Sequence, residues 1–410
     1  MSEWSKKTLG SMCTKIGSGA TPTGGKESYK DEGISLIRSQ NVEDFVFLYS
    51  GLAHIDDEQA RKLNNVMIEV NDTLINITGD SVARVCSVPD DVLPARVNQH
   101  VSIIRADGVQ LDNTFAKYAL LAMKEHLLSI SEIGATRRAL TKGMLESLEI
   151  STPEIDEQRL IASVLSSLDE KIDLLMRQNT TLESLAQAHF KQWLIEKADI
   201  SRNVGDLLES TLGGEWGEDN ASDSHPMPVY CLRGTDVAML TTGLATKIPL
   251  RYIKPSKFEK IKLTSRDIIL EISGGTDTQS TGRATYINER VKSLFDLPIV
   301  FSNFCRCLRF RKEEYVLPIY LYIKGKWEND EFFNLENGSS GIHNLDYKAF
   351  LYSAEYADTF PNDEEFMAIT KILNPMFEKI DKNKLQIVTL QKLRDTLLPK
   401  LISGEVCVKK

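Results

Sequence analysis

A glycine-rich segment near the start of the chain, residues 20–27, is the first candidate for chemistry, and it reads ATPTGGKE. Gly25 and Lys26 are typical of a loop that binds phosphate groups. However, Ala20 stands where such a loop has its first glycine, and Glu27 replaces the hydroxyl residue that would bind a metal ion. Nucleotide hydrolysis is therefore not expected of this segment.

A second group of residues suggests methyl transfer. Residues 374–377, NPMF, are similar to the Asn/Asp-Pro-Pro-Tyr/Phe motif of amino-methyltransferases. Met376 replaces the second proline of that motif, and no glycine-rich cofactor turn follows a predicted strand elsewhere in the chain. A helix kink at Pro375 is the better interpretation.

The remaining reactive side chains are scattered. No serine or cysteine nucleophile motif accompanies the histidines at positions 54, 100, 189 and 343. The six cysteines form no CxxC pair and no Cys/His spacing suited to zinc, which is typical of a chain in a reducing compartment. We therefore predict no catalytic residue, no cofactor-binding residue and no metal site in this chain.

The composition limits the class of protein and the number of domains. The 410 residues are 42% apolar and 26% charged, which suits a globular chain of two or three domains. The sequence lacks an apolar signal segment and any run of about 18 apolar residues, so we expect a cytoplasmic protein. The net charge of −9 argues against a chain that holds a polyphosphate by itself. A local exception is the basic run 247–266, which includes Lys254 and Lys257 and could equally be a solvated face.

Two similar segments, 153–195 and 361–403, organise the rest of the chain. They align without a gap at an offset of 208 residues, and their apolar residues recur every three or four positions, as in a heptad seam. The first segment allows an unbroken helix of about 45 residues. We predict that the two helices pair as an antiparallel coiled coil, although two unrelated amphipathic helices, each packed on its own domain, remain an alternative. The predicted pairing residues are Ile161, Leu165, Leu168, Ile172, Leu175, Leu182, Ile369, Leu373, Met376, Ile380, Ile387, Leu390 and Leu397.

Polar residues interrupt this seam at Asn179, His189, Asn383 and Arg394, where they would cost stability and could fix the register of the pair. Pro375 and Pro399 are expected to kink the second helix or split it into pieces.

The regions outside the helices form a second repeat. Residues 1–152 suggest a mixed α/β domain with strands near 34–38, 66–70, 73–78, 82–88 and 100–105 and a helix near 114–130. Residues 201–360 repeat this plan, first at an offset of 195 residues and then at 204. The predicted fold class is α/β (α+β), with two similar domains separated by long helices. The predicted regions are 1–152 and 201–360, which are globular, and 153–200 and 361–410, which are helical.

These features together resemble the specificity subunit of type I restriction-modification enzymes. The residues that carry the resemblance are Gly19-Ala20-Thr21-Pro22, Ile34 to Arg38, Gly134 to Leu140, Pro153 to Ile161 and Leu397 to Glu405. The resemblance spans essentially the whole chain. The second copy departs from it, because Phe366 stands where the first copy has Gln158, and Glu215-Trp216 replaces a Thr-Pro turn.

The resemblance implies a protein that binds double-stranded DNA and has no active site of its own. Each globular domain would be a target recognition domain that reads one half of a bipartite, gapped site. The helices would act as a spacer and dock two modification (methyltransferase) subunits carrying S-adenosylmethionine. Restriction (endonuclease and translocase) subunits would add ATP and magnesium, and the source would be bacterial or archaeal.

Candidate DNA-binding residues are polar side chains in the turn segments and in the basic run. Asparagine and glutamine suit adenine in the major groove, and arginine suits guanine. The candidates are Gln40, Asn41, Thr78, Asn98, Gln99, Arg137, Arg138, Arg233, Thr235, Lys254, Lys257, Thr278, Gln279, Asn303, His343 and Asn344. Two other classes stay open at this point: a self-contained adenine DNA methyltransferase, and a coiled-coil adaptor that does not bind DNA.

Overall fold

The computed structural model describes residues 4–22, 24, 28–132, 138–197, 200–242, 248–276, 278–337, 343–353 and 358–408. The chain divides into two compact units. The first unit contains Met1–Lys171 and Gln391–Lys410, and the second contains Ile172–Leu390. Both divisions fall within long helices, so each unit holds one globular region and a part of each helix.

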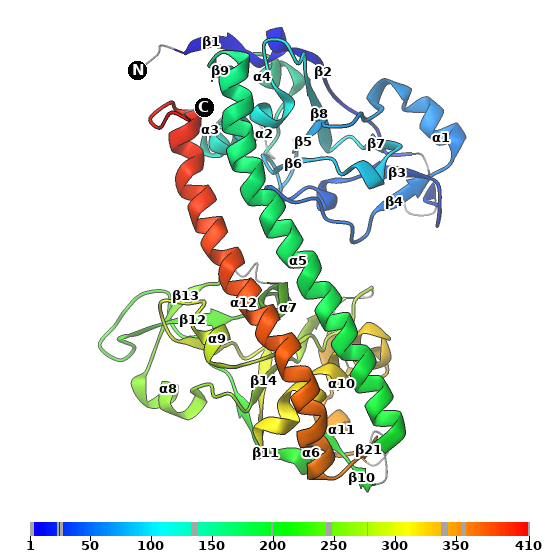
Figure 1. Cartoon of the computed structure of the whole chain (residues 1–410), viewed down its shortest axis with the longest axis vertical. Coiled ribbons are helices and arrows are strands. Elements are labelled where there is room, and N and C mark those ends of the chain that lie inside the picture. Colours follow the sequence, from blue (N-terminus) through cyan, green and yellow to red (C-terminus); the bar gives the residue numbers. More distant parts are fainter. Residues whose placement is uncertain are drawn as a thin grey trace. The chain divides into compact units, whose positions relative to one another are not determined.

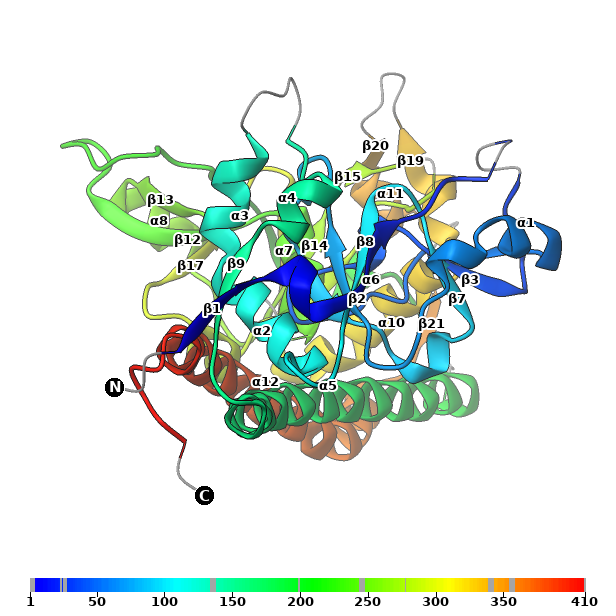
Figure 2. The same ribbon diagram turned by 90° about the horizontal axis from the view of Figure 1, so that it is seen from above.

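The two long helices are α5 (Ile155–Lys197) and α12 (Asp363–Ile402), which lie side by side in Figures 1 and 2. They pair antiparallel, because Asp169 of α5 contacts Arg394 of α12, whereas the later Asn179 contacts the earlier Asn383. The predicted long helices and their antiparallel pairing are confirmed.

We expected proline to kink the second helix or to split it into pieces, and the structure excludes the split. Helix α12 continues through Pro375 and Pro399. A proline inside a helix costs about 3 kcal/mol through its missing N–H and its clash with the preceding turn. Beside Pro375, Leu373 and Phe377 are almost completely buried, and this packing offsets that cost.

The first unit is built on two small sheets. One is antiparallel in the order β2-β8-β5-β6, formed by β2 (Cys13–Ser18), β8 (Val101–Ala106), β5 (Thr73–Asn76) and β6 (Val85–Ser87). The other has the order β4-β3-β7 with β3 and β7 parallel, formed by β4 (Ala53–Ile55), β3 (Ile34–Ile37) and β7 (Ala95–Val97). A separate pair, β1 (Ser5–Thr8) and β9 (Glu149–Thr152), joins the start of the unit to the residues before α5.

Short helices complete the first unit: α1 (Asp57–Lys62), α2 (Asn113–Ala122), α3 (Lys124–Ser131) and α4 (Lys142–Glu146). The helix predicted at 114–130 is thus two helices separated at Met123. The strand predicted at 66–70 was wrong, because Asn64–Val66 forms a 3-10 turn and the following residues make only one isolated bridge, between Met67 and Arg96.

The second unit repeats both sheets. Its antiparallel sheet has the order β11-β18-β14-β16, formed by β11 (Leu208–Gly213), β18 (Cys305–Phe310), β14 (Asp267–Glu271) and β16 (Ala284–Tyr286). Its mixed sheet has the order β13-β12-β17, formed by β13 (Leu250–Ile253), β12 (Met227–Leu232) and β17 (Ile299–Phe301). The joining pair is β10 (Ile200–Arg202) and β21 (Asp358–Phe360).

One further sheet in the second unit has the order β15-β20-β19, formed by β15 (Ser273–Gly275), β20 (His343–Leu345) and β19 (Glu336–Asn337). The helices of this unit, besides the long ones, are α6 (Val204–Leu207), α7 (Gly234–Thr242), α8 (Pro255–Ile261), α9 (Glu289–Lys292), α10 (Val316–Glu328) and α11 (Tyr347–Tyr352).

Strand register confirms the internal repeat residue by residue. Ile37 pairs with Val97 in the first unit, and Leu232 pairs with Phe301 in the second, so the predicted offsets of 195 and 204 residues hold on both strands. A buried ion pair is also repeated, between Arg105 and Asp72 in the first unit.

Its counterpart in the second unit joins Arg309 to Asp267. Both aspartates are completely buried. Each accepts two hydrogen bonds from its arginine and a third from the backbone three residues upstream. The pair ties the antiparallel sheet to the preceding loop in the same way in both units.

The apolar faces of the long helices pack against the globular regions as well as against each other. Ile172, Leu175 and Ile387, with Leu390 packed against them, form a cluster contributed by the helices alone. The other predicted pairing residues that belong to core clusters share them with a globular region: Ile161, Leu165 and Leu397 in the first unit, and Leu182, Ile369, Leu373, Met376 and Ile380 in the second. Leu168 is half-buried. Among the described residues, no helix is both long and apolar enough to span a membrane.

Candidate nucleic-acid interface

Three loops of the first unit bring most of its predicted DNA-binding residues together. They follow β3, β5 and β7 and carry Gln40, Thr78 and Gln99 respectively. Because β3 and β7 are parallel neighbours, the loops after them start at the same edge of one sheet. A main-chain hydrogen bond from Asn98 N to the Ile37 carbonyl, 3.0 Å, joins those two loops directly.

A chain of side-chain hydrogen bonds runs through these loops. Thr78 Oγ1 lies 2.6 Å from His100 Nδ1, and His100 Nε2 lies 3.1 Å from Gln99 Nε2. Gln99 Oε1 accepts a hydrogen bond from Thr21. The Thr21 segment reaches this position because Gly19 passes so close to the Val97 carbonyl that an added Cβ would overlap it. Gln99 is exposed while its neighbours fix its orientation.

Two predicted residues of the first unit have structural roles instead. Asn41 is completely buried, accepts a hydrogen bond from Arg38 N, and donates to the carbonyls of Leu48 and Ser50. Asn98 is also buried and accepts a hydrogen bond from His100 N at 3.0 Å. Their side chains are committed to holding the loops, so we do not carry them into the proposed interface.

The other predicted residues of the first unit lie at its surface. Gln40 is exposed and donates to the Gly51 carbonyl at 3.1 Å. Arg138 is exposed, and its guanidinium lies 2.6 Å from Glu132. Its carbonyl accepts a hydrogen bond from Gly79 N, which places it beside Thr78. Arg137 lies outside the described residues.

The equivalent loops of the second unit surround a cavity of about 550 Å³. Three predicted residues line it: Arg233, Thr235 and Asn303. Arg233 is oriented by Asp236, whose carboxylate accepts from the arginine Nε at 2.9 Å and Nη2 at 3.0 Å. These hydrogen bonds raise the pKa of Arg233 above its ordinary value, although burial lowers it. Thr235 and Asn303 are exposed.

A second buried ion pair forms part of the wall of this cavity. Glu271 is 1% exposed and accepts hydrogen bonds from Arg283 at 2.7 and 2.5 Å. Hydrogen bonding to Glu271 raises the pKa of Arg283, although burial of the Arg283 side chain lowers that pKa. The pair is therefore a fixed, neutralised part of the wall and not a free cation.

The remaining predicted residues of the second unit fall into two groups. Asn344 and His343 lie on β20, which pairs with the cavity strand β15, and His343 Nδ1 lies 2.7 Å from Glu336. Thr278 and Gln279 are exposed in a turn after the same strand. The other group consists of two lysines at the start of α8, which are not among the residues that line the cavity. Lys254 is exposed there, and Lys257 lies 3.5 Å from Glu215.

Four residues that the sequence analysis did not select belong to these sites. Thr21 and His100 take part in the hydrogen-bonded chain of the first unit, and Trp216 and Phe304 line the cavity of the second. The offsets of 195 and 204 residues make Trp216 the counterpart of Thr21 and Phe304 the counterpart of His100. Because the repeat relates these four residues only to each other, it gave no signal for them.

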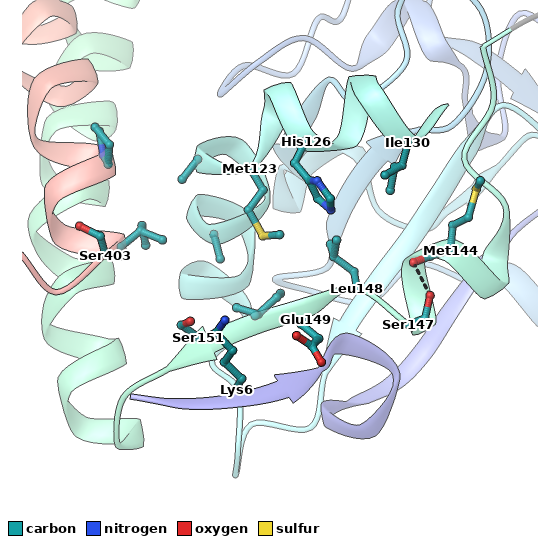
Figure 3. Close-up of a pocket in the computed structure, with 15 residues that line it drawn as sticks. Lys6, Met123, His126, Ile130, Met144, Ser147, Leu148, Glu149, Ser151 and Ser403 are labelled. Carbon is teal, nitrogen blue, oxygen red and sulfur yellow. Dashed lines mark hydrogen bonds between the residues drawn. The ribbon is translucent and has the colours of Figure 1, made fainter. Parts of the chain in front are cut away.

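A separate cavity of about 710 Å³ lies in the first unit, and none of the predicted DNA-binding residues lines it. Figure 3 shows Met123, His126 and Ile130 on one wall, with Leu148 and Glu149 opposite them. Its lining includes the end of α12 and combines apolar side chains with polar ones such as Lys6, His126 and Glu149. Among the described residues, no group of three or more metal-binding side chains is present.

A duplicated α/β domain with polar loops at equivalent positions, carried on paired long helices, defines a protein that recognises a target with two related surfaces. Residues 1–184 match the family model of the "Type I restriction modification DNA specificity domain". The chain is 23% identical to the MjaIX specificity subunit of Methanocaldococcus jannaschii, over 99% of this chain and 94% of that protein. It is 25% identical to the HindI specificity subunit of Haemophilus influenzae, over 99% and 100% respectively.

A solved structure supports the fold. The S subunit of a type I restriction-modification system from M. genitalium is 18% identical and matches 97% of this chain and 96% of its own, with a TM-score of 0.50. Residues 1–184 therefore carry the DNA specificity domain of type I restriction-modification systems, and the whole chain is similar in sequence to specificity subunits of such systems. It is accordingly a recognition subunit and not an enzyme, as the sequence predicted.

Proposed function

We propose that each globular domain, residues 1–152 and 201–360, reads one half of a bipartite DNA site. The observation that carries this proposal is that the same loop positions of the two domains hold different exposed side chains on the same strand register. Gln40 and Gln99 in the first domain correspond to Thr235 and Asn303 in the second. Two domains with the same backbone fold but different exposed side chains suit a target whose two halves differ in sequence.

The helical regions 153–200 and 361–410 act as the spacer and as the docking surface for two modification subunits. Large apolar side chains on these helices face solvent, among them Leu174 and Leu185 on α5 and Ile372 on α12, which are 58%, 46% and 47% exposed. Such residues at helix positions outside the seam are suited to packing against helices of a partner.

The modification subunits bring S-adenosylmethionine and methylate adenine, and restriction subunits bring ATP and magnesium, all in the cytoplasm of a bacterium or archaeon. The net charge of −9 is compatible with this arrangement, because partners that enclose the duplex supply most of the phosphate contacts. The isolated chain therefore binds DNA weakly.

The test compares matched variants of the two domains. Gln99→Ala and Asn303→Ala are each assembled with the modification subunits, and bound sequences are selected from a random duplex pool. Each variant should relax base preference in one half-site only, by about 1 to 3 kcal/mol for a lost base contact. Lys254→Ala is the control for a phosphate contact, which weakens all sequences alike and lowers the salt dependence. Loss of preference in both halves from either single variant would contradict the proposal.

A further inference from the structure

The loop sites of the two units differ in chemistry although their backbones correspond. In the first unit, the position of His100 belongs to a hydrogen-bonded chain with Thr78 and Gln99. In the second unit, the equivalent position is Phe304, which is 54% exposed. The inference drawn from this difference rests on the proposed function and concerns how the second domain reads its half-site.

The backbone on either side of the exposed Phe304 ring is fixed by hydrogen bonds. Its neighbours Ser302 and Cys305 are buried, and Cys305 N donates to the Ser302 carbonyl at 3.0 Å to close a tight turn. The Phe304 carbonyl accepts a hydrogen bond from Ile272 N at 2.8 Å. The ring is therefore presented by two strands of the antiparallel sheet.

The surroundings of the ring combine an apolar wall with polar groups. Phe304 and Trp216 line the 550 Å³ cavity together with Thr235 and Asn303. Trp216 replaces the threonine that supports Gln99 in the first unit, so the second site gains apolar surface where the first makes hydrogen bonds. Trp216 is itself fixed, because the Arg251 guanidinium lies 4.6 Å from the centre of its ring.

An exposed aromatic ring in an apolar wall is suited to one group on DNA. In the major groove, only thymine offers an apolar group, its 5-methyl, and phenylalanine is among the side chains that contact it. Asn303, exposed and adjacent in sequence, supplies the polar contact beside it. We propose that Phe304 reads the 5-methyl group of a thymine in the second half-site.

The test removes the methyl group and nothing else. The bound sequence is first selected with the modification subunits present. Each thymine of the second half-site, on either strand, is then replaced in turn by deoxyuridine, which keeps its pairing edge. One replacement should weaken binding about fourfold, the amount expected for one buried methyl group. In Phe304→Ala the same replacement should have no effect.

Phe304→Leu, which keeps an apolar side chain, should retain part of the sensitivity. It also guards against a folding defect, since both Phe304 variants should bind DNA that carries an altered second half-site as well as the unmodified chain does. A second half-site without thymine would overturn this inference alone. So would thymines that all tolerate deoxyuridine, or a sensitivity that persists in Phe304→Ala. Absence of sequence-specific binding by the assembled complex would instead overturn the proposed function and this inference with it.

Discussion

Replacing Arg309 by methionine should strongly destabilise the second unit. Arg309 donates from Nε and Nη2 to Asp267, each at 2.8 Å, and from Nη2 to the Lys262 carbonyl at 2.7 Å. Hydrogen bonding to Asp267 raises the pKa of Arg309 above its ordinary value, although burial lowers it. Asp267 is completely buried, and in the variant its carboxylate loses both arginine donors while it keeps the backbone donor Thr264 N, at 2.7 Å.

Breaking a buried ion pair by removing one partner costs about 3 to 5 kcal/mol, because the other charge is left buried without compensation. The Arg309 side chain is 17% exposed, so water reaches part of the site and we expect about 3 kcal/mol. Asp267→Asn removes the stranded charge. The double variant should therefore be more stable than the sum of the two single losses implies, by about 1 to 2 kcal/mol.

The internal repeat provides a control. Arg105→Met removes the equivalent pair with Asp72 in the first unit. Urea unfolding combined with hydrogen exchange resolved to β14 and β18, or to β5 and β8, measures which unit is weakened. Arg309→Met should lower protection in the second unit only. A loss below about 1 kcal/mol, or strictly additive effects of Arg309→Met and Asp267→Asn, would refute the reasoning.

Two further changes test other buried or partly buried contacts. Asn383 donates to Asn179 at 2.8 Å on the helix seam. Asn383→Leu should therefore lower the thermal midpoint and cost about 1 to 3 kcal/mol of unfolding free energy. Adding Asn179→Leu should recover most of that free energy, because no unpaired amide then remains on the seam. Hydrogen bonds from Lys312 and Tyr315 lower the pKa of Asp363 from 3.8 to about 2. The stability this provides is present above pH 4 and is lost as the pH falls toward 2, so Asp363→Asn should flatten that acid limb of the stability curve, measured by urea unfolding at each pH.

The long helices and the repeat could be predicted because both are periodic signals that do not depend on distant contacts. The helix predicted over 153–195 forms α5, and strand register reproduces the offsets of 195 and 204 residues between the two domains. The strand predicted at 66–70 fails for a local reason. Val66 is buried while Met67 and Val70 are about half-exposed, so the apolar pattern of a strand is met by a 3-10 turn and an extended loop.

The candidate site was harder to predict, since a polar residue after a strand can read a partner or hold its own loop. Asn41 and its counterpart Asp236 both accept a hydrogen bond from the backbone N–H of the arginine three residues earlier, which is a structural role. Thr21 and Gln99 are 78 residues apart and meet only in the fold. Local sequence carries no sign of such a contact.

Equivalent positions of the two long helices also make different contacts with their domains. Tyr118 of α2 donates to Asp169 of α5 at 2.6 Å in the first unit. At the offset of 208 residues Asp169 becomes Phe377, which packs edge-on against Tyr320 of α10 with ring centres 5.9 Å apart. The Tyr320 hydroxyl then donates to Glu183 of the other helix. The partly buried Asp169 carboxylate would lose its Tyr118 donor if it faced another domain, so each domain fits its own stretch of the helix pair and exchange of the two domains is disfavoured.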